Sequence, residues 1–599
     1  MAKSPPRPPH VFGSPVPAHA PAHAVLLGQA RALHQAGRLP EAERLYRDVL
    51  RVRPRSAEAL HGLGVLALQA GHPLPATELI AQALVISPGD ADAHANLGVA
   101  WLSAGRPAEA LASVDRALAL APANAQAQGN RGLALNALER HEEALEALQP
   151  ALAAWRGDAE LHYAHGNVLL ALRRAPEAVE AYGRCLALAP AHLDARLHRG
   201  NAWRALRRHD EAIADYDAVL ATAPAYAGAV ANRADALMEA RRHAEAAAAY
   251  TRLLELDAAA PYAAGKRLHA RAMACDWHDW DAQVAAIEAG LAEGRRVIEP
   301  FAYSAIAREP LALRRCATLF ADDQYPPRPP RVPRGHRYPG HARVRLGYLC
   351  GEFRNQATTL LAIELWELRD RERFELVAFD NSWDDDSALR RRIEGAFDEI
   401  VDISQLSDDA AAAEIVRRET DVLVNLNGWF GLGRTGVFAR RPAPLQVNFL
   451  GFPGTLGAPY LDVLVADAVI VPEGEEGAYV ERVVRLPRCY QPNDRQRAIA
   501  PRVPTREEAG LPPQGVVFAC FNNTYKILPA MFAAWMRILR QVEGSVLWLL
   551  DDNAEAVLNL RAAAVREGVA PQRLCFAPRL RSSRARTDLA TNIARRSWA

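Results

Sequence analysis

A lysine stands where a strand-forming stretch gives way to a helix. Lys526 closes the segment FNNTYK (521–526), which follows the apolar run VVFACF (516–521) and precedes a helix expected over 529–541. A lysine at such a turn can neutralise a diphosphate, because backbone amides and the dipole of the following helix also favour negative charge there. A lysine at a helix start is also often simply solvated, so its position alone leaves the role open.

Two further loops with unusual residues follow apolar runs. GEFRNQATT (351–359) follows VRLGYLC (344–350), and the Gly/Pro-rich segment LGFPGTLGAPY (450–460) ends the run LQVNFLG (445–451). In open parallel sheets, ligands bind outside the carboxyl ends of the strands. We therefore expect these loops and the lysine segment to face a common cleft.

Short Val/Ile/Leu-rich runs that alternate with helical stretches predict the sheets that carry these loops. Runs of this length are typical of buried parallel strands. Residues 342–512 are predicted to form a doubly wound, Rossmann-like first domain, and 513–580 a β-α-β-α-β unit, one half of a second such domain. The expected strands are 344–350, 375–380, 421–427, 445–451, 462–467, 516–521, 545–550 and 573–577.

The first half of the chain repeats every 34 residues. Three residue types keep this spacing: proline at 54, 88, 122, 190 and 224, glycine at 64, 98, 132, 166 and 200, and alanine at 42, 76, 110, 144, 178, 212 and 246. A helix–turn–helix unit of this length buries its apolar face only by stacking on its neighbours. We predict an α-solenoid of about seven tetratricopeptide-like repeats over residues 23–260, after a disordered tail (1–22).

The groove of this solenoid is the expected site of protein binding. Asn96, Asn130 and Asn232 precede a glycine or alanine of the repeat by two residues. These amides could hydrogen-bond the backbone of a bound peptide, although asparagine is equally tolerated on a solvated helix face. Residues 261–341 are predicted as a helical cap, in which Trp277 and Trp280 anchor a helix, followed by a proline-rich linker.

The quoted loops also carry a family resemblance. NQATT, LVNLNG, RRPAPLQVNFLGFPGTLGAPYLD, FNNTYKILP and SVLWLL resemble the catalytic region of the O-linked N-acetylglucosamine transferase family, of the bacterial type. The resemblance covers residues 342–578. It implies a GT-B pair of Rossmann-like domains, the second incomplete, and inverting transfer of a sugar from UDP-GlcNAc to protein Ser/Thr hydroxyls without a metal or other cofactor.

The resemblance also implies roles for particular residues. Lys526 would stabilise the leaving diphosphate, which is electrostatic catalysis. Contacts to the nucleotide sugar are expected from Asn522, Asn523, Tyr525, Leu450, Gly451, Pro453, Gly454, Thr455 and Thr358.

The sequence departs from the family pattern at two places. Gln356 occupies a position where many members have histidine, and an amide can hydrogen-bond but cannot accept a proton. Beyond about residue 580 the family-like sequence gives way to an Arg-rich tail (581–599), as a shifted reading frame or a gene fragment would produce. The alternative interpretation of these residues is a basic tail that evolved for a function of its own.

The composition excludes several other classes of protein. The net charge of +1 gives no general case for nucleic acid or a membrane surface, and no apolar run approaches a membrane helix. Seven scattered cysteines suit a reducing, cytoplasmic compartment. The convex face of a solenoid could also form a homodimer.

Three functions remain open at this point. The first is a UDP-sugar glycosyltransferase acting on proteins presented by the repeats, possibly impaired by truncation. The second is a catalytically silent repeat scaffold that binds proteins. The third is a transferase for another nucleotide sugar or acceptor, because related folds vary in both.

Overall fold

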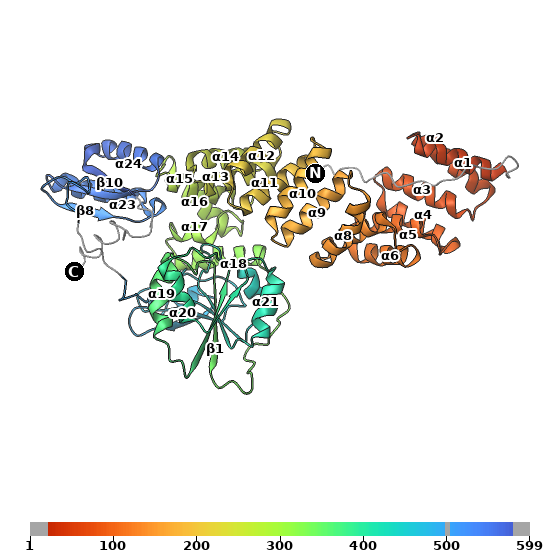
Figure 1. Cartoon of the computed structure of the whole chain (residues 1–599). Coiled ribbons are helices and arrows are strands. Elements are labelled where there is room, and N and C mark those ends of the chain that lie inside the picture. The colour runs from red at the N-terminus through yellow and green to blue at the C-terminus, as the bar shows by residue number, and fades with distance from the viewer. Residues whose placement is uncertain (1–21, 498–503, 579–599) are drawn as a thin grey trace. The chain divides into compact units, whose positions relative to one another are not determined.

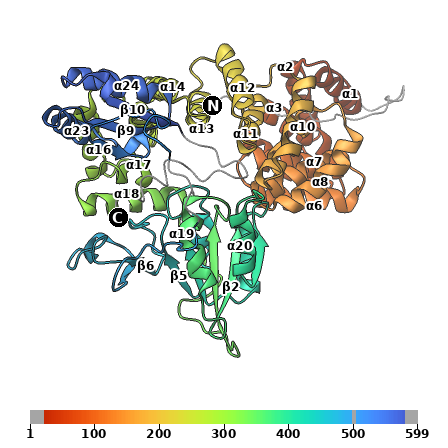
Figure 2. The same ribbon diagram turned by 60° about the vertical axis from the view of Figure 1, so that its left-hand side comes forward.

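The computed structural model describes residues 22–497 and 504–578, which fall into two compact units whose boundary lies between Arg207 and Arg208. The described part of the first unit is helical (Figure 2). Its helices are α1 (Ala22–Gln35), α2 (Leu39–Val52), α3 (Ala57–Gln69), α4 (Pro73–Ile86), α5 (Ala91–Ser103), α6 (Pro107–Leu120), α7 (Ala125–Ala137), α8 (His141–Ala154), α9 (Ala159–Ala171), α10 (Ala175–Leu188) and α11 (Leu193–Ala205).

Capping side chains explain where the first helix of each repeat begins. Ser56, Asp90, Asn124 and Asp158 each accept a hydrogen bond from the backbone amide three residues later, at the start of α3, α5, α7 and α9. Each proline of the 34-residue pattern lies one residue after the cap that ends a second helix, where it cannot continue that helix.

The glycine and alanine patterns mark where the two helices of a repeat touch. A Cβ atom added to Gly64 would lie 2.5 Å from Cγ1 of Ile80, and one added to Gly166 would lie 2.5 Å from Cε1 of Tyr182. Glycine permits this approach without a shift of the facing side chain. The seven patterned alanines, from Ala42 to Ala246, are fully buried. The 34-residue spacing of glycine and alanine therefore reflects the close contact between the two helices of each repeat.

The second unit begins with helices and continues into two sheets. Its first helices are α12 (His209–Thr222), α13 (Ala227–Glu239), α14 (His243–Leu256), α15 (Ala263–Met273), α16 (Trp280–Ala292), α17 (Pro300–Ser304) and α18 (Pro310–Gln324). The linker then runs against the first α/β domain, where the amides of Arg328 and Arg331 donate to the carbonyls of Ala439 and Arg440.

A seven-stranded parallel sheet forms the core of the first α/β domain, in the order β3-β2-β1-β4-β5-β6-β7. Figure 1 shows β1 in this sheet with α19 and α20 on one side and α21 on the other. The strands are β1 (Val344–Cys350), β2 (Phe374–Asp380), β3 (Glu399–Asp402), β4 (Val422–Asn425), β5 (Leu445–Asn448), β6 (Val463–Ala466) and β7 (Arg482–Arg485). The helices are α19 (Ala357–Glu367), α20 (Ala388–Ala396), α21 (Asp408–Arg417), α22 (Thr435–Ala439) and the 3₁₀ turn η1 (Glu476–Ala478).

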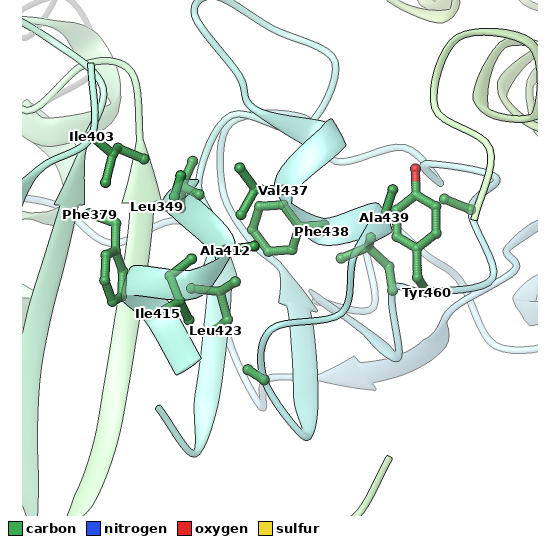
Figure 3. Packing of buried hydrophobic residues seen from close by; sticks show 14 of the residues in the cluster. Leu349, Phe379, Ile403, Ala412, Ile415, Leu423, Val437, Phe438, Ala439 and Tyr460 are labelled. Atoms are coloured by element: carbon green, nitrogen blue, oxygen red, sulfur yellow. The ribbon is translucent and has the colours of Figure 1, made fainter. Parts of the chain in front are cut away.

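The buried core of this domain lies between the sheet and its helices. Figure 3 shows Leu349 and Phe379 of the central strands packed toward Ile415 of α21. Burial of such side chains contributes about 1.5–3 kcal/mol each. The strand ends that carry the loops are thereby fixed in position.

A second, three-stranded parallel sheet follows, in the order β10-β9-β8. Its elements are β8 (Val517–Cys520), the 3₁₀ turn η2 (Thr524–Lys526), α23 (Pro529–Gln541), β9 (Val546–Asp551), α24 (Ala554–Arg566), the 3₁₀ turn η3 (Pro571–Arg573) and β10 (Leu574–Pro578). The predicted fold class, an α-solenoid followed by two parallel α/β sheets, is confirmed. Residues 1–21 and 579–599, on which a disordered tail and an aberrant tail were predicted, lie outside the described residues.

Within the described ranges, no helix has both the length and the apolar character to cross a membrane.

Candidate active site

Lys526 lies on the turn between β8 and α23, as its position in the sequence predicted. The turn η2 (Thr524–Lys526) places the lysine three residues before the first residue of α23, Pro529. Lys526 is exposed, and it has no ion-pair partner among the described residues; its Nζ lies 5.8 Å from the centre of the Tyr525 ring. Asn522 and Asn523 are exposed beside it. An unneutralised cation with neighbouring amides at a helix start suits an anionic ligand.

The lysine is also unusual for this chain. Of the 71 Lys and Arg residues in the sequence, three are lysines: Lys3, Lys266 and Lys526. Lys266 is paired with Asp235, with 2.9 Å between Nζ and Oδ1. Arginine carries nearly all of the positive charge elsewhere in the chain, whereas position 526 carries the compact positive charge of an ammonium group.

The helical segment predicted as a cap forms the base on which the lysine turn rests. The Thr524 hydroxyl donates to the Met273 carbonyl (2.7 Å), and Asn553 and Asn559 donate to the carbonyls of Met273 and Ala274 (both 2.9 Å). The Trp277 ring packs against Phe532 of α23, 5.3 Å between centres. These contacts fix the second sheet on the end of α15.

Tyr525 is held between two rings of this helical segment. Its ring centre lies 5.2 Å from that of His269 on α15 and 5.8 Å from that of Phe301 on α17. Phe301 in turn lies 5.6 Å from Phe430, in the loop after β4. Phe301 therefore touches a loop of each α/β domain. No sequence signal marked His269 or Phe301, because both lie outside the loops that follow strands.

Burial keeps His269 uncharged, and it lowers the pKa of this imidazole to about 4. Burial likewise raises the pKa of the Tyr525 hydroxyl. At neutral pH both rings are therefore neutral, and Lys526 is the cation of this turn.

Buried hydrogen bonds hold the loop after β1, and one of them joins it to the loop after β4. The Gly351 amide donates to Asn427 Oδ1 (2.8 Å), and the Thr358 hydroxyl donates to Glu352 Oε2 (3.3 Å). Gln356 begins α19 as its cap, where its side-chain oxygen accepts from the Ala357 amide (2.9 Å). The Gln356 oxygen thus already accepts one hydrogen bond, and the NH₂ group can donate to a ligand.

Glu352 is a buried carboxyl group that sequence reasoning did not single out. It is 2% exposed, and burial raises its pKa. It stands in the quoted segment GEFRNQATT, directly after β1, which is the only signal that could have drawn attention to it. Perturbed carboxyl groups are common at functional sites.

The loop after β5 packs tightly onto the loop after β4. Leu450 is buried with φ of +75°, and a Cβ atom on Gly428 would lie 2.5 Å from Cβ of Phe452. Asn448 donates to the Phe452 carbonyl (3.1 Å). A side chain on Gly451 would collide with the carbonyl of Leu426. The structure thus brings the three loops of the first domain together at the carboxyl ends of its strands.

The members of the LGFPGT segment differ in exposure. Gly451 and Pro453 are partly exposed, whereas Gly454 and Thr455 are buried. The Thr455 hydroxyl donates to Glu481 Oε2 (2.6 Å), and the Leu456 amide donates to Oε1 of the same carboxylate (2.7 Å). The Thr455 hydroxyl therefore already donates its hydrogen bond to a buried carboxylate in this structure.

The three asparagines of the repeats lie in different environments. Asn96 is 3% exposed, and its side-chain nitrogen lies 2.9 Å from Nε2 of His61. Asn130 is partly buried, and its side-chain nitrogen has no hydrogen-bond partner within the described part of the chain. Asn232 on α13 is partly exposed. A peptide-binding role for Asn96 would require it to leave His61.

The described fold and site define a class: a tetratricopeptide solenoid joined to two parallel α/β sheets with a lysine turn in the second. The family model for glycosyl transferase family 41 matches residues 328–502 and 495–584, and the tetratricopeptide repeat model matches segments between 27 and 227. The chain therefore belongs to glycosyl transferase family 41 over residues 328–584, behind tetratricopeptide repeats.

Curated relatives carry transferase names. The chain is 33% identical over 329 residues to a probable UDP-N-acetylglucosamine–peptide N-acetylglucosaminyltransferase (SEC) of Arabidopsis thaliana, covering 52% of this chain and 34% of that protein. It is 24% identical to the corresponding transferase of Caenorhabditis elegans, covering 39% of this chain and 30% of that protein. The chain thus spans about a third of each relative.

A solved structure is also similar. It is a mutant of the Thermobaculum terrenum O-GlcNAc transferase, with 23% identity, coverage of 83% of this chain and 75% of that chain, and a TM-score of 0.39.

Proposed function

We propose that this chain is a UDP-sugar glycosyltransferase that moves GlcNAc from UDP-GlcNAc to Ser/Thr hydroxyls of proteins. The observation that carries the proposal is Lys526, an exposed lysine with no ion-pair partner in residues 22–497 and 504–578, on a strand-to-helix turn of the family 41 region. The names of the curated relatives support the same donor and acceptor class.

Electrostatic catalysis would supply the main contribution to the rate. When the bond between the sugar and the diphosphate breaks, negative charge grows on UDP, and Lys526 with the neighbouring backbone amides would stabilise it. Removing one such donor typically costs about 10²–10³ in turnover.

Gln356 would orient the acceptor rather than deprotonate it. Its NH₂ group can donate to the acceptor hydroxyl oxygen, but an amide takes up no proton. We infer that the acceptor proton leaves to the diphosphate or to a positioned water. The repeats would present the acceptor protein, with Asn130 and Asn232 as candidate backbone contacts.

Transfer of labelled GlcNAc from UDP-GlcNAc to polypeptide, measured with the full chain and with Lys526→Ala, tests this function. We expect transfer by the parent chain and a loss of about 10²-fold or more in the variant. Saturable UDP binding without any transfer to protein would favour another acceptor. The absence of both binding and transfer would favour the silent protein-binding scaffold.

A further inference from the structure

A cleft of about 980 Å³ lies at the edge of the seven-stranded sheet opposite to the candidate active site. Its lining includes the first residues of β1, β4, β5, β6 and β7. All strands of this sheet run parallel, so the loops of the candidate site lie at their carboxyl ends and this cleft lies at their amino ends. Its volume falls within the range of small-molecule sites.

The lining of the cleft carries an excess of positive charge. Five arginines line it, whereas its acids are three: Glu372, Asp421 and Asp462. The arginines are Arg334, Arg337, Arg343, Arg373 and Arg482.

Two of the three acids are already hydrogen-bonded or ion-paired with neighbours. Asp421 Oδ2 lies 2.9 Å from Nδ1 of His341 and accepts the amide of Arg345. Asp462 pairs with Arg441 at 2.7 Å and with Arg334 at 2.7 Å. Glu372 is therefore the remaining acid of the lining, beside five arginines.

Three of the arginines stay uncompensated. Arg337, Arg373 and Arg482 are exposed, and none has an ion-pair partner within residues 22–497 and 504–578. They come from the linker, from the start of β2 and from the start of β7, yet they line one cleft. Guanidinium groups bind phosphate oxygens in a bidentate manner.

Three rings that line the cleft pack against one another: Tyr338, His341 and His336. The Tyr338 ring stacks on His341 at 5.4 Å with an interplanar angle of 25°, and His336 meets Tyr338 edge to face at 4.7 Å. Aromatic rings beside arginines are suited to a ligand that combines a planar base with phosphates.

We propose that this cleft binds a small molecule with at least two phosphate groups and a planar ring, of the nucleoside di- or triphosphate class, separately from Lys526. Arg337, Arg373 and Arg482 hold the phosphates, and Tyr338 contacts the ring.

Calorimetric titration of the full chain with inorganic pyrophosphate and with ATP tests the proposal. We expect saturable binding of both, weakened at least about tenfold by the triple variant Arg337→Gln/Arg373→Gln/Arg482→Gln. The matched triple variant Arg391→Gln/Arg417→Gln/Arg488→Gln changes three exposed arginines outside the cleft and keeps the affinity. Tyr338→Leu weakens ATP but not pyrophosphate.

Three results of these titrations would overturn the proposal. The first is no saturable binding at millimolar ligand, and the second is equal losses in the two triple variants. The third is tighter binding of oligoglutamate than of ATP, which would make the cleft a surface for acidic polypeptides. The Lys526→Ala variant separates the two sites: it keeps ATP binding in the cleft even if the proposed transferase activity fails, and loss of ATP binding there would assign the ligand to the donor site instead.

Discussion

The ring of Phe301 lies 5.8 Å from the ring of Tyr525, the residue next to Lys526, and 5.6 Å from Phe430 in the first α/β domain. One side chain of a short helix thereby contacts a loop from each sheet. The turn that carries Lys526 is positioned by helices that lie outside the sequence motif.

Replacement of Phe301 by alanine should loosen the lysine turn without unfolding either sheet. The Tyr525 ring loses an aromatic contact worth about 0.5–1.5 kcal/mol, so amides of 522–527 should exchange faster with solvent. The proposed transfer should show a lower kcat. Phe301→Tyr keeps the ring and serves as the control. Unchanged exchange in Phe301→Ala would mean that α17 does not position the turn.

Acidification should weaken the contact between α14, α15 and the second sheet. Burial lowers the pKa of His243 and of His269 to about 4, below the ordinary value of 6.5; for His243, Arg241 lowers it further and Asp552 opposes the shift. Between pH 6.5 and 4 the unfolded chain therefore binds more protons than the folded one. The contribution of these two histidines to the free energy of unfolding is complete above pH 6.5 and is lost as the pH falls toward 4.

The expected loss from pH 7 to 5 is about 2 kcal/mol per histidine. Hydrogen exchange of α15 amides, corrected for the intrinsic pH dependence, measures it. His269→Phe should reduce the slope by about half. An equal slope in that variant would show that another group controls the acid response.

Two glycines of the same repeat should respond oppositely to alanine. In Gly166→Ala the new Cβ would lie 2.5 Å from Cε1 of Tyr182, whereas Gly183→Ala meets nothing within 4 Å. We expect the first to destabilise by about 1–3 kcal/mol and the second to stabilise by about 0.5–1 kcal/mol. Urea unfolding followed by circular dichroism compares them. Equal midpoints would contradict the contact explanation of the 34-residue pattern.

Replacement of Thr455 should lower the free energy of unfolding. Thr455→Val removes a hydrogen bond to buried Glu481, whose pKa burial already raises, and it should cost about 1–3 kcal/mol. Thr455→Ser keeps the hydroxyl and should restore most of that stability. If Thr455→Val unfolds like the parent chain but loses donor binding, the threonine acts on the sugar, as the family resemblance predicted.

Much of the architecture was predictable from the sequence. The observed bounds of β1 and α23 are the predicted ones, 344–350 and 529–541, because both elements are bordered by clear turn signals. The strands β3 and β7 were not predicted. They are short, lie at the two edges of the sheet and carry charged residues, which is typical of edge strands.

One regular feature of the repeats was also missed. The residue before the second helix is arginine in most repeats, and it pairs with a glutamate three residues later, as in Arg140–Glu143 and Arg174–Glu177 (both 2.6 Å). The same spacing recurs at Arg38, Arg106, Arg208 and Arg242. These pairs are exposed and contribute little each, which is why attention to apolar spacing overlooks them.

The candidate site was predictable only in part. The lysine turn and the loops after β1 and β5 could be found because they follow strands, and parallel strands collect their loops at one edge. His269 and Phe301 could not be found, since their roles arise from packing between segments far apart in the sequence.

The rate at which Lys526 reacts with an amine-acetylating reagent, read by mass spectrometry, tests the central claim most directly. Lys266, paired with Asp235, is the internal reference. If the turn binds the diphosphate of the donor, UDP at ten times its Kd should slow acetylation of Lys526 about tenfold, uridine should not, and Lys266 should react at an unchanged rate. Acetylation of Lys526 at the same rate with and without millimolar UDP would contradict the account.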